Sequence, residues 1–280
     1  MIDIVLAVIA LIWLGYASIY DFKTKEVPDW ISYSLIIIGL AFYLIKSIVL
    51  KDLIFITQSL FGLLVLFLIG NLMYYTRQWG GGDVKLLSAL GALFPVYPKD
   101  LLNYFNPNLD LPFLLILSLN LIIFGALYSL IYSFYLVIKN KDKIKFNFKI
   151  NKIFLIIAVL FVLISLLLNE LETRLLALFL ALLVLIYPYI KNYISLVEKQ
   201  IMIKKINMNK LTEGDWIIED IYYKGKLIYN KNNPGISNNE IKLLKRCKIK
   251  NVLVKEGLPF IPSFLISLIV SLIVGNLLRI

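Results

Sequence analysis

Histidine is absent from this sequence of 280 residues, and Cys247 is its single cysteine. Without histidine, a Ser-His-Asp or Cys-His hydrolase and a histidine-ligated metal site are excluded. One cysteine allows neither a disulfide within the chain nor a zinc site built from cysteines. The acid–base groups that remain are carboxylates, lysine and tyrosine. We therefore expect a protein that needs no metal and no cofactor.

Charged residues are also scarce. They make up 17% of the chain, whereas 60% of its residues are hydrophobic. That balance is typical of a membrane protein with several spanning helices. The net charge of +11 is then better explained by lysine and arginine in cytoplasmic loops than by a nucleic-acid partner.

Long apolar runs predict the spanning helices, each of which needs about 20 residues. The candidate segments are 2–20, 30–50, 53–75, 84–96, 112–138, 153–168, 174–190 and 258–278. The fourth, sixth and seventh are short, and the last two of these could form a re-entrant hairpin. The first lacks the basic start and the cleavage site of a signal peptide, so we expect a retained helix. The predicted fold is all-α and polytopic, with about six to eight transmembrane helices and a small α+β cytoplasmic insertion.

The insertion is the block 191–257, where the apolar runs give way to polar sequence. Strands are predicted at 215–221, 226–229 and 251–255, with a helix that starts at the capping box from Ser237 to Glu240. Its acids have no metal-ligand spacing and are expected to be surface charges: Glu213, Asp215, Glu219 and Asp220. The predicted domains are a membrane core (1–138), a basic loop with a helical hairpin (139–190), this soluble domain (191–257) and a final transmembrane helix (258–280).

The distribution of lysine and arginine predicts the orientation. Placing the N-terminus outside puts most of these residues in cytoplasmic segments, as the positive-inside rule requires. The basic run 139–152 is then cytoplasmic and could contact anionic lipid head groups, or could simply be a solvated loop. The same orientation puts Asp21 and Asp83 on the cytoplasmic side of the membrane.

The stretch Gly80-Gly81-Gly82-Asp83 stands directly before the fourth apolar run. Three successive glycines allow positive φ angles and close approach by another chain. On its own, Asp83 could merely cap a helix, since a helix start favours an anion. Asp21, however, ends the first apolar run on the same predicted face of the membrane. The two aspartates together indicate a catalytic pair.

Two carboxylates are sufficient for peptide hydrolysis without histidine, cysteine or metal. The ionised carboxylate takes a proton from the attacking water, and the protonated one donates to the carbonyl oxygen and later helps the amine leave. Because two close carboxylates cannot easily both ionise, they share a proton and titrate as a pair.

The sequence here resembles a known family. Gly80-x-Gly82-Asp83 matches the G-x-G-D signature of membrane aspartyl proteases. Asp21, the Pro28-Asp29 loop and the run 81–91 are similar to the type IV prepilin peptidase family, and more narrowly to archaeal prepilin or preflagellin (prearchaellin) peptidases. The segment Pro259-Phe-Ile-Pro262 is similar to the closing segment of the archaeal enzymes, whereas 139–257 carries no usable motif. The N-terminal cysteine pairs and the methylating region of bacterial members are missing, so no methyltransferase activity is expected.

The resemblance implies that Asp21 and Asp83 are the catalytic residues. It also implies substrates that are pilin or archaellin precursors, whose short basic signal peptides are removed at the cytoplasmic face of the plasma membrane. Gly80, Gly81 and Gly82 would then let the substrate backbone approach. Glu26 and Asp29 could meet the basic signal peptide, although Asp29 is also placed to cap the second helix and Glu26 to be a plain loop charge.

Two other classes of protein fit part of this pattern. An intramembrane protease of the presenilin or signal-peptide-peptidase kind shares the G-x-G-D signature and a Tyr-Asp pair, which Tyr20-Asp21 matches. In that class the first aspartate lies within a helix rather than at its end. A transporter or membrane assembly factor would need no protease motif, but a transporter should carry polar residues inside its helices, where this chain has few.

Overall fold

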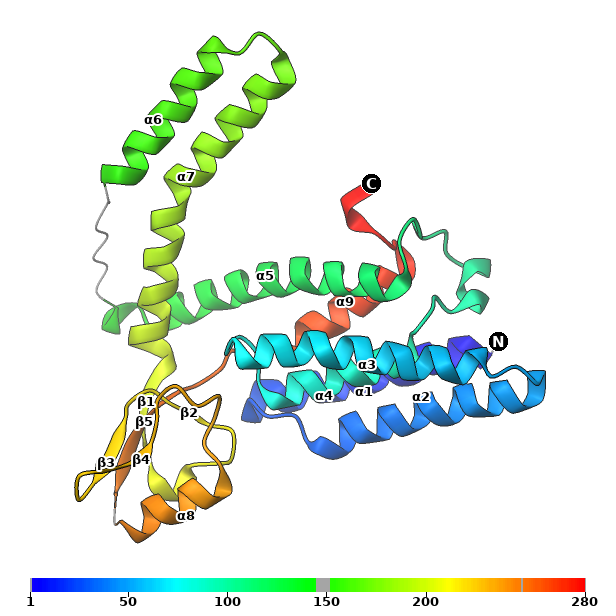
Figure 1. The fold of residues 1–280 in the computed structure, drawn as a ribbon, viewed down its shortest axis with the longest axis horizontal. Coiled ribbons are helices and arrows are strands. Elements are labelled where there is room, and N and C mark those ends of the chain that lie inside the picture. The colour runs from blue at the N-terminus through cyan, green and yellow to red at the C-terminus, as the bar shows by residue number, and fades with distance from the viewer. Residues whose placement is uncertain (1, 145–151, 248, 280) are drawn as a thin grey trace. The chain divides into compact units, whose positions relative to one another are not determined.

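A computed structural model describes residues 2–144, 152–247 and 249–279 (Figure 1). The α-helices are α1 (Ile2–Thr24), α2 (Asp29–Leu50), α3 (Ile54–Tyr75), α4 (Gly81–Leu93), α5 (Phe113–Lys139), α6 (Lys152–Leu167), α7 (Leu171–Val197), α8 (Asn238–Arg246) and α9 (Ile261–Ile273). The strands are β1 (Ile203–Asn207), β2 (Trp216–Ile217), β3 (Ile221–Tyr223), β4 (Lys226–Tyr229) and β5 (Asn251–Lys255). Residues 145–151 of the predicted basic run lie outside the described residues.

The predicted fold class is confirmed, because helices dominate the described residues and the strands are confined to a small region. Five helices are long and apolar enough to cross a membrane: α1, α2, α3, α5 and α7. The expectation that the seventh segment is short was wrong, since α7 has 27 residues. The predicted last span is shorter than expected, since α9 has 13 residues. The chain is therefore a multi-pass membrane protein.

The chain divides into two compact units. The first holds the residues up to Tyr132 together with those from Lys205 onward, and the second is Ser133–Lys204. In the second unit, α6 and α7 pack against each other as a helical hairpin, joined by a three-residue connection. Ser133 and Tyr193 share a hydrogen bond of 3.0 Å between their hydroxyls. The candidate site lies wholly in the first unit.

Glycine contacts fix α4 against α3. A Cβ atom on Gly62 would lie 2.3 Å from the backbone oxygen of Gly91, and a Cβ on Gly91 would lie 2.2 Å from that of Gly62. Further along the same contact, Gly70 of α3 packs against Val84 of α4. A Cβ atom on Gly70 would lie 3.0 Å from the valine side chain. Side chains larger than hydrogen would hold the two helices apart, as they do at other small-residue helix interfaces in membranes. These contacts determine where α4, and the aspartate in its first turn, can lie.

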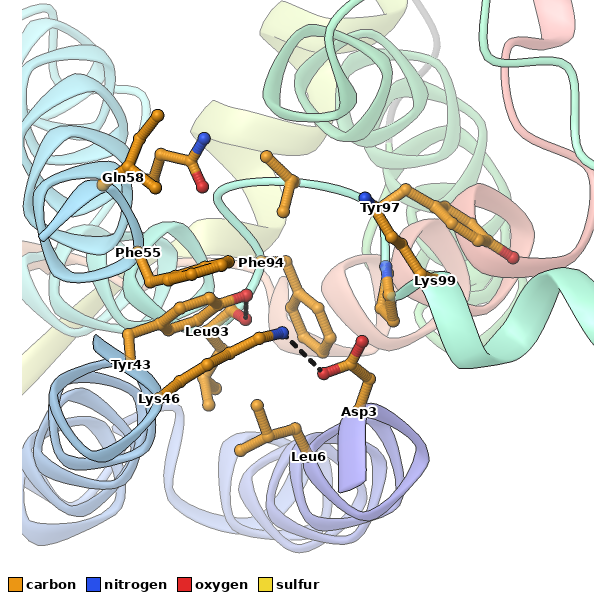
Figure 2. Close-up of a pocket in the computed structure, with 13 residues that line it drawn as sticks. Asp3, Leu6, Tyr43, Lys46, Phe55, Gln58, Leu93, Phe94, Tyr97 and Lys99 are labelled. Carbon is orange, nitrogen blue, oxygen red and sulfur yellow. Dashed lines mark hydrogen bonds and ion pairs between the residues drawn. The ribbon is translucent and has the colours of Figure 1, made fainter. Parts of the chain in front are cut away.

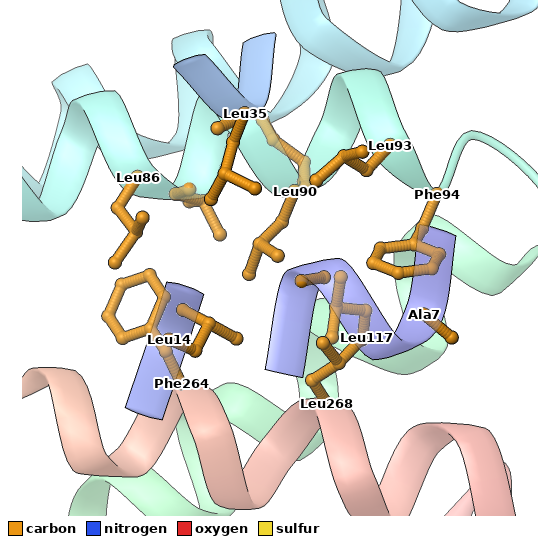
Figure 3. Packing of buried hydrophobic residues seen from close by; sticks show 14 of the residues in the cluster. Ala7, Leu14, Leu35, Leu86, Leu90, Leu93, Phe94, Leu117, Phe264 and Leu268 are labelled. Atoms are coloured by element: carbon orange, nitrogen blue, oxygen red, sulfur yellow. The ribbon is translucent and has the colours of Figure 1, made fainter. Parts of the chain in front are cut away.

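The apolar core of the first unit fills the space between these helices. Leu86, Leu90 and Leu93 of α4 face Leu14 of α1 and Phe264 of α9 (Figure 3). All five side chains are almost completely buried. The short α4 is thus covered by protein on several sides, which explains how an apolar helix of 13 residues is accommodated.

A polar residue inside α5 has a structural role. The Asn120 amide donates to the hydroxyl of Ser271, at 2.9 Å, and to the backbone oxygen of Gly275, at 2.8 Å. Asn120 is completely buried. It fastens α5 to the C-terminal part of the chain, so it is not evidence of a transport pathway.

The polar insertion forms a small domain with its own core. Its three-stranded sheet has the order β1-β5-β2, in which β2 pairs antiparallel with β5 through Ile217 and Val254, and β3 and β4 form a separate two-stranded sheet. The predicted strands 226–229 and 251–255 are confirmed, and so is the capping box at the start of α8, where Ser237 N–H donates to Glu240 at 2.8 Å. The single strand predicted at 215–221 is instead two, β2 and β3, and β1 was missed. The core is small, as expected of so short a segment.

Candidate active site

Asp21 lies in the last turn of α1 and its side chain is buried, with 5% of the residue exposed. Its Oδ2 accepts a hydrogen bond from the backbone N–H of Ile261, at 2.8 Å. Ile261 is the first residue of α9, so its N–H has no partner within that helix. The Asp21 carboxylate of α1 thus accepts a hydrogen bond from the first backbone N–H of α9, a helix more than 200 residues later in the chain.

Asp83 lies in the first turn of α4, outside the five helices long enough to span a membrane. Its Oδ2 accepts a hydrogen bond of 2.9 Å from the backbone N–H of Gly80. The aspartate therefore does cap its helix, as the sequence allowed. The bond uses one carboxylate oxygen, and it holds the side chain at the start of α4.

The two carboxylates are close enough to interact. Burial raises the pKa of the Asp83 carboxyl to about 7, the N–H of Gly80 opposes that shift, and the charge of Asp21 adds to it. A carboxyl with such a pKa is still partly protonated near neutral pH, whereas an ordinary aspartate is fully ionised, and the acid of a catalytic pair must carry a proton. The structure thus brings together the two residues that the sequence selected.

The glycines before Asp83 lack the positive φ angles that the sequence allowed. Gly80 has φ −78° and ψ 163°, and none of the three has a positive φ angle. Crowding does not require glycine at these positions either, since an added Cβ would make at most ordinary van der Waals contacts. A Cβ on Gly82 would lie 3.4 Å from the Val27 side chain, whereas a Cβ on Gly81 would meet nothing within 4 Å. Gly81 is exposed, so its backbone is accessible to another chain beside Asp83.

The predicted cap at Asp29 was wrong. The N-cap of α2 is Pro28, which makes no side-chain capping bond, and Asp29 is the first helical residue. Its Oδ1 instead forms an ion pair with Lys85 Nζ, at 2.6 Å. Lys85 comes two residues after Asp83, so this ion pair joins the start of α2 to the start of α4. Both side chains are partly exposed, and exchanging such a pair for another cation costs little.

Glu26 is exposed and contacts the small domain. Its Oε1 accepts a hydrogen bond of 2.9 Å from the Thr212 hydroxyl. The neighbouring Lys25 forms an ion pair with Glu256. Burial raises the pKa of the Asp215 carboxyl, hydrogen bonds from Thr212 oppose that shift, and the charges of Glu26 and Glu256 add to it. The expectation that Asp215 is a plain surface charge was therefore wrong, because it lies half-buried at this contact.

Other parts of the described residues offer no competing catalytic centre. No group of three acidic or cysteine side chains among them is arranged to hold a metal ion. A cavity of about 440 Å³ lies near the start of α1 and the end of α2, where Lys46 pairs with Asp3 at 3.4 Å (Figure 2). This cavity lies at the other end of α1 from Asp21 and has neither aspartate in its wall.

These features define a class of protein: a multi-pass membrane protein with two interacting aspartates at one end of its helices. Residues 8–139, which carry both aspartates, match the type IV leader peptidase family. With the relatives below, this match confirms the resemblance of this part of the chain to the type IV leader peptidase family and to its archaeal prepilin and preflagellin peptidases.

Three relatives support this placement. A preflagellin peptidase of Methanocaldococcus jannaschii is 39% identical over 90 residues, which are 32% of this chain and 38% of that protein. A preflagellin peptidase of Methanococcus maripaludis is 29% identical over 140 residues, 50% of this chain and 59% of that protein. The prepilin peptidase EppA of Methanothermobacter thermautotrophicus is 22% identical over an alignment covering 99% of this chain and 96% of that protein. The chain thus spans less than two thirds of the two preflagellin peptidases. No solved structure matches the chain.

Sequence reasoning missed two residues beside the aspartates. Phe260 precedes the Ile261 N–H that binds Asp21, and its ring centroid lies 5.6 Å from that of Trp79, the residue before the glycines. The segment Pro259-Phe-Ile-Pro262 was the available signal, since it stood out in the sequence. Its position beside Asp21 could not be inferred, because the contact joins the two ends of the chain.

Proposed function

We propose that this protein is an aspartyl endopeptidase that removes short basic signal peptides from type IV pilin-like or archaellin precursors. The observation that supports the proposal most is that burial and the charge of Asp21 raise the pKa of the Asp83 carboxyl, as expected of two carboxylates that share a proton. The family of residues 8–139 and the names of the relatives support the reaction and the substrates.

In the proposed reaction Asp21 is the ionised member of the pair and Asp83 the protonated one. Asp21 takes a proton from a water molecule as its oxygen attacks the scissile carbonyl, and Asp83 donates its proton to the carbonyl oxygen. When the tetrahedral intermediate collapses, the amine leaves with a proton and the pair returns to its singly protonated state. The exposed backbone at Gly81 is where the extended substrate is expected to lie, with Gly80 and Gly82 beside it.

Glu26 and Asp29 are the proposed contacts for the basic signal peptide. Both are exposed and lie in or beside the loop that follows Asp21. Asp29 already pairs with Lys85, so a lysine or arginine of the substrate would take the place of that cation or share the carboxylate. Exposed ion pairs of this kind are worth at most about 1 kcal/mol, which makes such an exchange feasible.

The test of this function is cleavage of candidate precursors by the purified protein. Mass spectrometry should find one cut, at the end of the basic signal peptide and before the apolar helix. A cut within the apolar helix would instead favour an intramembrane protease of the presenilin kind. Intact precursors, incubated with protein that is folded and monodisperse, would contradict both enzymes and favour a membrane assembly factor.

The rate of cleavage should fall as the pH rises above about 7. Asp83 supplies the shared proton, and with a pKa of about 7 it loses that proton as the pH rises through this value. The measurement is kcat as a function of pH, with near-ultraviolet circular dichroism at each pH as a control for folding. A kcat that keeps rising to pH 9 in folded protein would contradict the role given to Asp83.

We also propose that the aspartates and the small domain face the cytoplasm of the cell, with the protein in the plasma membrane. Cys247, which ends helix α8, reports the side on which the small domain lies. A thiol reagent that does not cross membranes should label Cys247 in lysed cells and leave it unlabelled in intact cells. Labelling of equal extent in intact cells would contradict the proposal and show that the small domain faces the outside of the cell.

A further inference from the structure

The segment 256–261 crosses the end of α1, and each end of this segment contacts a residue there. Glu256 forms an ion pair with Lys25, the residue after α1. Five residues later, the backbone N–H of Ile261 donates to Asp21 Oδ2 at 2.8 Å. Between them, Phe260 contacts the rest of the site.

Phe260 contacts elements on both sides of the catalytic pair. Its ring centroid lies 5.6 Å from that of Trp79 and 5.8 Å from that of Phe264. Trp79 directly precedes the turn that carries Asp83. On the α5 side the ring sits against Gly125, where a Cβ atom would lie 2.6 Å from the tip of the ring. One side chain thus contacts α5, α9 and the residue before the glycine turn, next to the N–H that binds Asp21.

We propose that Phe260 is a positioning residue of the catalytic pair. The Phe260 ring packs against Gly125 on one side and Trp79 on the other, and these contacts determine the position of the start of α9. The Ile261 N–H at that start then holds the Asp21 carboxylate toward Asp83. This inference rests on the proposed function. Phe260 acts through the backbone at the start of α9 and through Trp79, and it takes no part in the proton transfers.

Gly125→Ala tests the proposal from outside the site. The added methyl group meets only the tip of the Phe260 ring within close range, so it displaces the ring without changing the chemistry of either catalytic side chain. Gly15→Ala is the matched control, because it is the same substitution in another apolar helix and its Cβ meets nothing within 4 Å. The double variant Gly125→Ala with Phe260→Leu restores space, since leucine lacks the outer atoms of the ring.

The first measurement is cleavage kinetics. Gly125→Ala should lower kcat by on the order of 10²-fold with little change in KM, the effect expected of misplaced catalytic groups. Gly15→Ala should match the wild type, and the double variant should recover much of the lost rate. A kcat for Gly125→Ala equal to that of Gly15→Ala would overturn the inference and leave the proposed function standing.

The second measurement needs no activity. An apolar carbodiimide modifies accessible carboxyl groups, and mass spectrometry gives the rate at Asp21. We expect faster modification of Asp21 in Gly125→Ala than in Gly15→Ala, because the displaced start of α9 no longer covers the carboxylate. Equal rates would overturn the inference. If the wild type cleaves no precursor, the proposed function has failed, and this comparison alone decides whether Phe260 positions Asp21.

Discussion

Asp21→Asn and Asp83→Asn are each expected to abolish cleavage, with losses of several orders of magnitude in kcat. An amide can neither take a proton from water nor cycle a shared proton. The folded structure should survive both changes, because an asparagine oxygen can still accept the hydrogen bond from Ile261 N–H or from Gly80 N–H. The double variant should be little worse than either single one, since the two residues act as one unit.

Asp29→Asn is the control for these variants. It removes a carboxylate on the same side of the unit, but one that is exposed and forms an ion pair with Lys85. We expect a small loss of rate. Substantial activity in either catalytic variant would exclude the mechanism. Inactivity of Asp29→Asn as deep as theirs would show that a third acid is essential.

The second large effect is expected at the contact between α3 and α4. Gly91→Ala places a Cβ 2.2 Å from the backbone oxygen of Gly62 and 2.7 Å from its carbonyl carbon. Backbone atoms cannot rotate away as a side chain can, so the helices must separate. Overpacking of this kind typically destabilises a protein by about 1–3 kcal/mol, although alanine is otherwise about 1 kcal/mol better than glycine in a helix.

Gly91→Ala should therefore lower the unfolding temperature in detergent and also reduce cleavage, because α4 carries Asp83. The matched control is again Gly15→Ala, for which the Cβ meets no atom within 4 Å and a neutral or slightly higher unfolding temperature is expected. The measurement is thermal unfolding followed by tryptophan fluorescence, together with the cleavage rate. An unfolding temperature and a rate equal to those of Gly15→Ala would show that the close packing of α3 on α4 is not required.

The residues that sequence could identify are those whose chemistry is visible locally. Asp21 and Asp83 stand at the ends of apolar runs, and the glycines mark the turn before Asp83. Their side of the membrane followed from the charge distribution and stays a prediction. The helices were predicted because a long apolar run has one stable form in a membrane.

Contacts between segments that are distant in the chain could not be predicted from the sequence. Asp29 was expected to cap α2, but the pairing with Lys85 depends on how α2 packs on α4. The bond from Ile261 to Asp21 and the contacts of Phe260 join the two ends of the chain. No periodicity or spacing predicts them. The half-burial of Asp215 likewise depends on the small domain meeting the loop after α1.

The most direct test of the two-carboxylate mechanism is a single turnover in water enriched in oxygen-18. If Asp21 and Asp83 activate a water molecule, the new carboxyl group of the released signal peptide should carry one heavy oxygen. Neither aspartate should carry any, and tryptic peptides containing them would be measured in the same mass spectrum. Heavy oxygen in Asp21 or Asp83 would indicate a covalent acyl-enzyme and contradict the account, and so would failure of folded protein to release the signal peptide.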